Sequence, residues 1–184
     1  MKDFIVVGSG IGSFCFCKRL AENKKTFTVI SDFSGSATSV AGGIINPIVL
    51  KKFKLFWNAI EFYNEAVSFY KKLYHDTHLN FLAKKDIIRA FSSVEEQNEW
   101  FTAADKPVLS DFLNTNILDN DSKLNSQFKL GLMNKAYLVD AKNILNYFHN
   151  KFLAADQLKN DEFDYSKLTF FDSHFEYKNI PAEN

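Results

Sequence analysis

An apolar run that leads directly into a glycine-rich turn constrains this chain more than any other feature. Residues 4–7 have the composition of a short strand, and Gly8, Gly10 and Gly12 follow at once, before a segment with helical periodicity. Glycine permits a tight turn and lets the backbone approach a phosphate, while the first N–H groups of the helix face that charge. The pattern is typical of the first turn of a Rossmann dinucleotide-binding fold. Ser13 replaces the usual third glycine, and an ordinary strand–turn–helix without a ligand is the alternative.

The segment after this turn completes a βαβ unit. Apolar residues recur at helical spacing from Phe14 to Ala21, and residues 27–30 form a second apolar run. Strand, helix and strand imply a parallel sheet with a right-handed crossover. In dinucleotide folds an acidic residue about twenty positions beyond the glycines binds the ribose hydroxyls, and Asp32 lies at about that distance. The alternative is that Asp32 only begins a turn with residues 33–35.

A loop of small and polar residues follows at positions 36–47. It contains the hydroxyl side chains of Thr38 and Ser39, and then Gly42 and Gly43. Such a loop exposes many backbone N–H groups beside the first phosphate site. It therefore favours a long cofactor over a mononucleotide.

The rest of the chain alternates between helical and extended patterns. The sequence predicts a long amphipathic helix at 53–74, a strand at 87–91, a helix begun by a capping box at 92–96 and ending near residue 100, loops over 105–125, two strands at 128–132 and 136–139 joined by a turn, a helix from Asp140 to 152, and short strands at 168–171 and 174–177.

The overall charge of the chain gives no support for a charged macromolecular partner. The chain has 184 residues, with 22 basic and 22 acidic side chains, so its net charge gives no case for nucleic acid or an anionic membrane. Lys51, Lys52 and Lys54 form a small basic cluster that is more typical of a solvated face than of a phosphate clamp.

Cysteine usage indicates a reducing compartment. Cys15 and Cys17 are two positions apart on a predicted helix, where they cannot pair with each other. Neither a signal pattern nor an apolar run of membrane-spanning length occurs, so we expect a cytoplasmic protein without a membrane anchor. The histidines have no metal-ligand spacing, and we expect no metal site.

Taken together, these residues resemble the FAD-dependent oxidoreductases of the D-amino-acid oxidase and glycine oxidase family. The resemblance rests on the strand with Gly8 and Gly10, on the run Thr38-Ser39-x-x-Gly42-Gly43-Ile44-Ile45-Asn46-Pro47, and on the aromatic helix after it. It is nearest the branch that includes the oxidase domain of the bifunctional enzyme modifying the tRNA wobble uridine. The fold it implies is α/β, a Rossmann-like FAD-binding domain with a parallel sheet plus part of an inserted α+β substrate domain.

The resemblance also implies domains and a cofactor site. Residues 1–50 would form the Rossmann βαβ unit and flavin loop, residues 51–139 a helical segment and partial substrate domain, and residues 140–184 the return to the FAD-binding domain. The implied FAD contacts are Gly8, Gly10, Ile11, Gly12 and Ser13 at the pyrophosphate, Ser31 or Asp32 at the adenosine ribose, and Thr38, Ser39, Gly42, Gly43, Ile44 and Ile45 along the ribityl chain and flavin. The family's ribose-binding acid aligns best with Ser31.

The implied activity is oxidation of a C–N bond in an amino acid or aminomethyl group, by hydride transfer to the flavin. Family members are longer, and we expect this chain to be an N-terminal fragment that lacks most substrate-orienting residues, so no catalytic residue is predicted. The zero net charge of the chain gives no support for tRNA as a partner. An NAD(P)-binding Rossmann dehydrogenase and a non-catalytic remnant that binds another protein are the alternatives.

Overall fold

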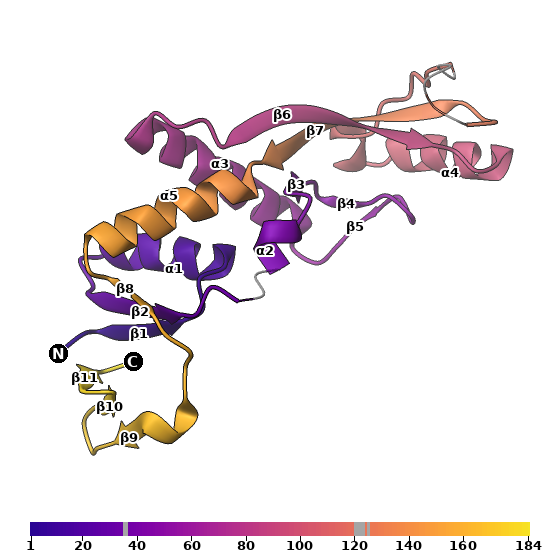
Figure 1. The fold of residues 1–184 in the computed structure, drawn as a ribbon. Helices are drawn as coiled ribbons and strands as arrows, with labels where there is room; N and C mark the ends of the chain where they lie inside the picture. Colours follow the sequence, from indigo (N-terminus) through magenta and orange to yellow (C-terminus); the bar gives the residue numbers. More distant parts are fainter. Residues whose placement is uncertain (35–36, 120–123, 125) are drawn as a thin grey trace. The chain divides into compact units, whose positions relative to one another are not determined.

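A computed structural model describes residues 1–34, 37–119, 124 and 126–184 (Figure 1). The chain forms two compact units. Unit 1 consists of Met1–Ala41 and Asp140–Asn184, and unit 2 consists of Gly42–Val139. The functional domains expected from the sequence remain a prediction.

Unit 1 is built on a parallel sheet. Strand β1 (Phe4–Val7), helix α1 (Ile11–Glu22) and strand β2 (Phe27–Ser31) form the predicted βαβ unit, with β1 and β2 parallel. A third strand, β8 (Leu158–Asn160), pairs in parallel with β2 and was not predicted. The sheet order is β1-β2-β8, so the carboxyl ends of all three strands lie at one edge.

Aromatic side chains fill the core of unit 1. Helix α5 (Ala141–Ala154) contacts α1, and the Phe14 ring stacks on Phe148 with their centroids 4.9 Å apart. Phe27 of β2 meets Phe152 edge to face at 5.3 Å. Helix α5 begins as predicted, because the Asp140 carboxylate accepts a hydrogen bond from the Asn143 backbone N–H at 3.1 Å.

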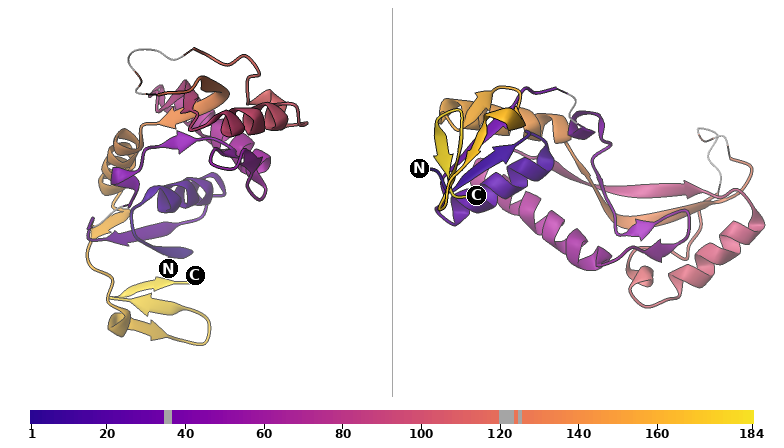
Figure 2. Two further views of the ribbon diagram at one scale, coloured as in Figure 1. Left: turned by 90° about the vertical axis from the view of Figure 1, so that its right-hand side faces the viewer. Right: turned by 90° about the horizontal axis from the view of Figure 1, so that it is seen from below.

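A second sheet of unit 1 is antiparallel. It contains β9 (Leu168–Phe170), β10 (Phe175–Tyr177) and β11 (Ile180–Ala182), after a 3₁₀ turn η2 (Tyr165–Lys167). The strands predicted in this region are confirmed, and β11 is an addition. Figures 1 and 2 show α1 and α5 on one face of the parallel sheet and this second sheet toward the other face.

Unit 2 is organised by a long antiparallel ribbon of β6 (Leu82–Ala90) and β7 (Leu130–Val139), with the short β3 (Ile44–Ile45) on the other edge of β7. The two strands predicted over 128–139 are therefore one strand, and the predicted turn is wrong. Lys135 has a left-handed φ of 58°, and the register shifts between Lys85 and Ile87. The turn-like residues around Lys135 thus form a local irregularity within the continuous β6–β7 pairing instead of a turn.

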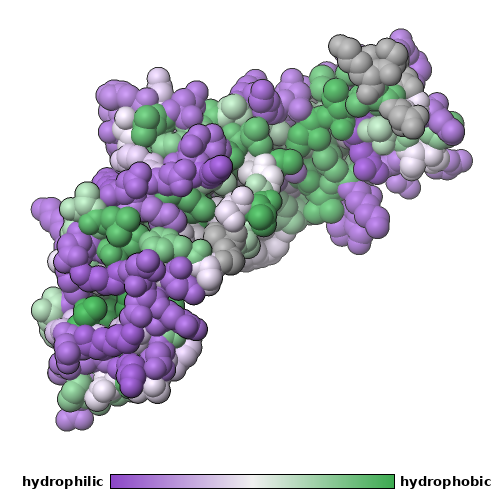
Figure 3. Space-filling model, viewed as in Figure 1, coloured by the Kyte–Doolittle hydropathy of each residue, from purple (hydrophilic) through white to green (hydrophobic). Residues whose placement is uncertain are grey.

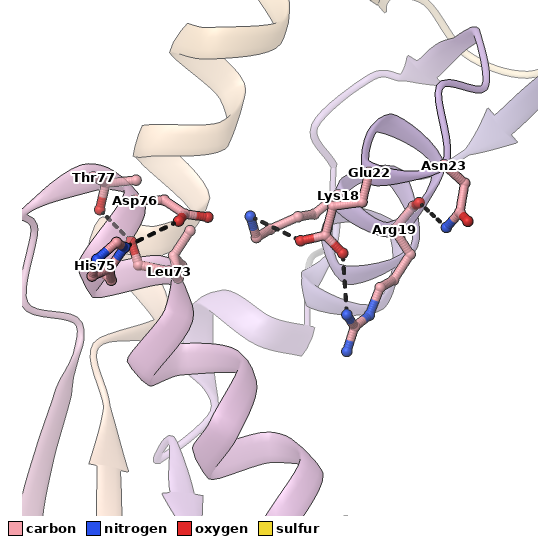
Figure 4. A network of polar contacts seen from close by, with 8 residues as sticks. All are labelled: Lys18, Arg19, Glu22, Asn23, Leu73, His75, Asp76 and Thr77. Carbon is pink, nitrogen blue, oxygen red and sulfur yellow. Dashed lines mark hydrogen bonds and ion pairs between the residues drawn. The ribbon is translucent and has the colours of Figure 1, made fainter.

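The long helix α3 (Ala59–Thr77) is confirmed, but it begins later than predicted. Residues before it form a hairpin of β4 (Ile48–Val49) and β5 (Lys54–Leu55), and Asn58 has a left-handed φ of 48°. Strand pairing has overridden the helical spacing of residues 53–57. Figure 4 shows the last turns of two helices, with the Thr77 hydroxyl bonded to the Leu73 carbonyl in α3 and the Asn23 amide bonded to the Arg19 carbonyl after α1.

The core of unit 2 surrounds Trp100, a residue of α4 (Val94–Ala104). The 3₁₀ turn η1 (Leu109–Asp111) follows this helix. The predicted cap is present in a modified form: the hydroxyl of the N-cap residue Ser93 accepts from the Glu96 N–H at 3.1 Å, and the Glu96 carboxylate accepts at 2.6 Å from the N–H of Ser92, one residue before the N-cap. The helix continues past residue 100 to Ala104, since Ala103 and Ala104 are buried with the tryptophan.

Apolar side chains reach the surface of unit 2, and the cysteines are unpaired with each other. In Figure 3 apolar surface gathers where Figure 1 draws β4 and β7, whose exposed side chains include Val49 and Leu138. Both cysteines are free thiols, and burial raises the pKa of Cys17 to about 12. Among the described helices, none combines the length and apolar character needed to cross a membrane.

Candidate functional site

The turn after β1 has the geometry that its glycines predict. Gly8 has a φ of 92°, a conformation that other residues rarely adopt, and its N–H donates to the Ile30 carbonyl at 2.8 Å. Gly10 is the N-cap residue of α1, and a Cβ atom there would lie 3.4 Å from the Thr38 hydroxyl. The absence of a side chain at Gly10 therefore lets Thr38 lie close to the backbone of this turn.

The first turn of α1 carries no negative charge of its own. Gly10 makes no side-chain cap, and no acidic residue occurs in the first turn, whereas Ser93 caps α4 and Asp140 caps α5. The first N–H groups of a helix have no partner within the helix and carry a partial positive charge. One of them, at Ile11, donates to the Thr38 hydroxyl at 3.1 Å. The helix end is suited to an anion.

A pocket of about 430 Å³ lies at the carboxyl ends of the parallel strands, where ligands bind in open α/β sheets. It brings together eight of the predicted site residues: Gly8, Gly10, Ile11, Gly12, Ser13, Ser31, Asp32 and Thr38. Their role in binding remains a prediction, but they line one cavity in unit 1.

The two candidates for the ribose contact are held differently. The Ser31 hydroxyl is 2.9 Å from the Ser9 hydroxyl in a buried contact, and it accepts from the Phe33 N–H at 3.1 Å. The exposed Asp32 carboxylate accepts from the Ser34 N–H at 2.9 Å and from its hydroxyl at 2.6 Å. These hydrogen bonds lower the pKa of Asp32, so it is ionised at neutral pH. The Ser31 hydroxyl thus makes hydrogen bonds within the protein, whereas Asp32 places a charged carboxylate at the pocket.

Sequence reasoning missed the part of the pocket that follows β8. Asp161, Glu162 and Phe163 line it from the third strand. The only signal was the pair of acids directly after Leu158–Asn160, a segment with a single apolar residue that is too short to be recognised as a strand. Phe163 stacks on the buried Tyr177 at 4.4 Å, which fixes this wall.

Charge around this pocket is acidic. Asp32, Asp161 and Glu162 line it, and no lysine or arginine does so within the described residues. Lys178 forms an ion pair with Asp161 at 2.6 Å and neutralises part of that charge. Backbone N–H groups, rather than basic side chains, would have to bind a phosphate here.

Ser39 does not line this pocket. It lies with Phe33, Val40 and His149 at another hollow of unit 1, of about 500 Å³, between α2 (Ala37–Val40) and α5. The ring of His149 meets Phe33 at 4.8 Å, and its Nε2 is buried without a partner in the described part of the chain.

Gly42, Gly43, Ile44 and Ile45 belong to unit 2. Gly43 has a φ of 66°, and a Cβ atom on it would overlap the carbonyl oxygen of Val139, so this glycine is required by the fold. Ile44 and Ile45 form β3 and pair with Leu138 and Tyr137 of β7. Their contact with a flavin remains a prediction. No cluster of three or more potential metal ligands occurs among the described residues.

Comparison with known proteins identifies the fold. No protein-family model matches the sequence. Glycine oxidase from Geobacillus kaustophilus is similar to this chain with a TM-score of 0.67 at 14% identity, over 95% of this chain and 50% of that one. L-alpha-glycerophosphate oxidase from Mycoplasma pneumoniae, a structure with FAD bound, has a TM-score of 0.54 at 15% identity, over 95% and 48%.

A third similar structure is L-amino acid deaminase from Proteus vulgaris, with a TM-score of 0.60 at 14% identity over 82% of this chain. This chain spans only 38% of that deaminase. The mixed α/β fold with a parallel sheet is thus one found in amino acid oxidases and deaminases. At these identities the likeness extends to the fold alone.

Proposed function

We propose that this chain is the FAD-binding part of a flavin-dependent oxidoreductase that oxidises a C–N bond of an amino acid or aminomethyl group. The observation that carries the proposal is the uncapped start of α1, whose N–H groups line a pocket at the carboxyl edge of a parallel sheet. The fold shared with amino acid oxidases and deaminases supports the choice of reaction.

The residues of the pocket fit the adenosine and pyrophosphate portion of FAD. The glycine turn offers backbone donors and no side chain at Gly10, which suits a pyrophosphate. The ionised Asp32 can accept hydrogen bonds from ribose hydroxyls. A 2′-phosphate would instead meet the carboxylates of Asp32, Asp161 and Glu162, so the site disfavours NADP.

The residues present in this chain bind and orient. Backbone N–H groups near Gly12 and Ser13 would hold the pyrophosphate, and Thr38 would hold the turn through Ile11. FAD, when bound, supplies the chemistry by accepting a hydride from the carbon that bears the nitrogen. We further propose that the chain represents an N-terminal part of such an enzyme and that it is nearest the tRNA wobble-uridine branch.

The proposal is tested by titrating FAD into the purified 184-residue chain and following flavin fluorescence and absorbance. We expect saturable binding at one site, and weaker binding of NAD. Gly10→Val should weaken FAD binding by at least about tenfold, because its side chain enters the pocket toward Thr38. Ser173→Ala, at an exposed position in unit 1, is the control. A folded chain that binds no FAD, or that binds NAD more tightly, contradicts the proposal.

A further inference from the structure

A second polar hollow lies in unit 2, between the tip of the β4–β5 hairpin and the carboxyl-terminal half of α4. Its volume is about 540 Å³, within the range of small-molecule sites. Lys51 and Lys52 line it from the hairpin and Lys106 from the residues after α4, with Glu99 as the single acid. In Figure 3 the tip of this hairpin forms hydrophilic surface.

The hairpin is fixed to the helix by one aromatic contact. Phe53 is only 5% exposed, and its ring meets Trp100 of α4 edge to face at 5.4 Å. Its backbone has a left-handed φ of 44°, and the Lys52 N–H closes the turn on the Val49 carbonyl at 2.9 Å. A left-handed phenylalanine is costly, and burial of its ring offsets that cost. The two hairpin lysines therefore project from an anchored turn.

The three lysines give the hollow an excess of positive charge that its one acid, Glu99, balances only in part. Within the described residues, Lys51, Lys52 and Lys106 form no ion pair, while Lys135 of the same unit pairs with Asp111 at 3.4 Å. Three ammonium groups against one carboxylate repel one another, and an anion between them would relieve that repulsion. Because the whole chain has no net charge, this excess is a local property.

We propose that this hollow binds a phosphate-bearing small molecule. A phosphate group carries a charge of about −1.5 to −2 at pH 7 and three acceptor oxygens, and pyrophosphate carries more, so either balances several ammonium groups better than one carboxylate with a single charge. The amide of Asn98, on the wall of the hollow, adds a neutral donor or acceptor for the rest of the ligand. The site lies in unit 2, so it is separate from the pocket of the proposed FAD function and does not depend on it.

The test is calorimetric titration of the full chain with inorganic pyrophosphate, in the wild type and in two double variants. Lys51→Gln with Lys106→Gln removes two charges from the hollow. Lys84→Gln with Lys85→Gln removes two exposed charges from β6 of the same unit, away from the hollow, and is the matched control. We expect the first variant to lose at least about tenfold in affinity and the control to lose less than about twofold.

A second arm distinguishes the source of the phosphate. A short single-stranded RNA is titrated under the same conditions, with the salt concentration varied. Pyrophosphate binding that needs Lys51 and Lys106, with RNA binding weak and equally reduced in both variants, supports the proposal. Equal pyrophosphate affinity in the wild type and the hollow variant overturns it, and so does RNA binding that is stronger than pyrophosphate binding and lost with the hollow lysines.

Discussion

The hydroxyl groups of Ser9 and Ser31 lie 2.9 Å apart in a buried contact that joins the turn after β1 to the end of β2. Ser31 is 8% exposed and Ser9 is 7% exposed. The same Ser31 oxygen accepts from the Phe33 N–H, so one side chain ties together both loops beside the pocket. The sequence resemblance places the family's ribose-binding acid at this position, yet here the side chain is used within the protein.

Replacing Ser31 with alanine should therefore destabilise unit 1. The Ser9 hydroxyl and the Phe33 N–H would each lose a buried partner, and the free energy of unfolding should fall by about 1–2 kcal/mol. Urea denaturation followed by circular dichroism measures this change. Ser173→Ala should leave the midpoint unaltered, and a Ser31→Ala midpoint equal to wild type would show that the contact contributes nothing.

Adjacent glycines offer a matched pair in unit 2. Gly43→Ala places a Cβ atom against the Val139 carbonyl and requires a left-handed φ, so we expect a loss of about 2–4 kcal/mol in the free energy of unfolding. In Gly42→Ala the new atom meets nothing nearer than Ile44 at 4.0 Å, and the loss should stay under about 1 kcal/mol. Thermal denaturation of both variants, side by side, tests the difference. Equal losses would contradict the strained conformation of Gly43.

Asp32 has two possible roles, and two variants separate them. If its carboxylate binds the ribose, Asp32→Ala should weaken FAD binding by about tenfold. Ser34→Ala removes only the hydroxyl that bonds to Asp32 and leaves the backbone bond of the turn intact, so FAD affinity should hardly change. Fluorescence titration gives both affinities. If both variants bind FAD as the wild type does, Asp32 only stabilises the turn with Ser34 and does not contact FAD.

His149 should make the stability of unit 1 depend on pH near neutrality. Burial lowers its pKa below the ordinary value of 6.5, and a hydrogen bond with the Ser9 backbone opposes this shift only in part. The unfolded chain therefore binds the proton more readily than the folded chain. Its contribution to stability is complete above the unfolded pKa and is lost as the pH falls toward the lower, folded pKa.

The free energy of unfolding of the wild type should thus decrease between about pH 7.5 and about pH 5.5. In His149→Phe, which keeps an aromatic ring against Phe14 and Phe33, this slope should be smaller. Chemical denaturation at a series of pH values measures the slope independently of the absolute stability. An unchanged slope would assign the dependence to other groups.

Local patterns predicted the part of the fold that depends on neighbouring residues. The strand–turn–helix–strand of β1, α1 and β2 follows from apolar periodicity and from glycines at fixed positions. The start of α4 follows from the Ser93 and Glu96 capping box, and the start of α5 from Asp140. Each of these signals lies within one continuous segment of the chain, which is why a single sequence reveals them.

Pairing between distant segments could not be predicted in the same way. The turn expected before Ala136 does not form, because β6 supplies a partner along the whole of β7. Residues 53–57 leave the helix because of the β4–β5 hairpin. Asp161 and Glu162 reach the candidate site only because β8 adds to β2, more than a hundred residues earlier in the chain. The glycine turn was visible in the sequence, but this wall of its pocket was not.

The uncapped start of α1 has a consequence for the abundance of the protein. A helix start without a side-chain cap from its own N-cap residue or an acid, where Thr38 accepts from one N–H, gains further stabilisation from an anion that binds there. Any such ligand favours the folded state by mass action, by about 2.7 kcal/mol at a hundredfold excess over its dissociation constant. A cell short of that ligand would degrade the chain faster, so the supply of a small molecule would set how long each copy survives.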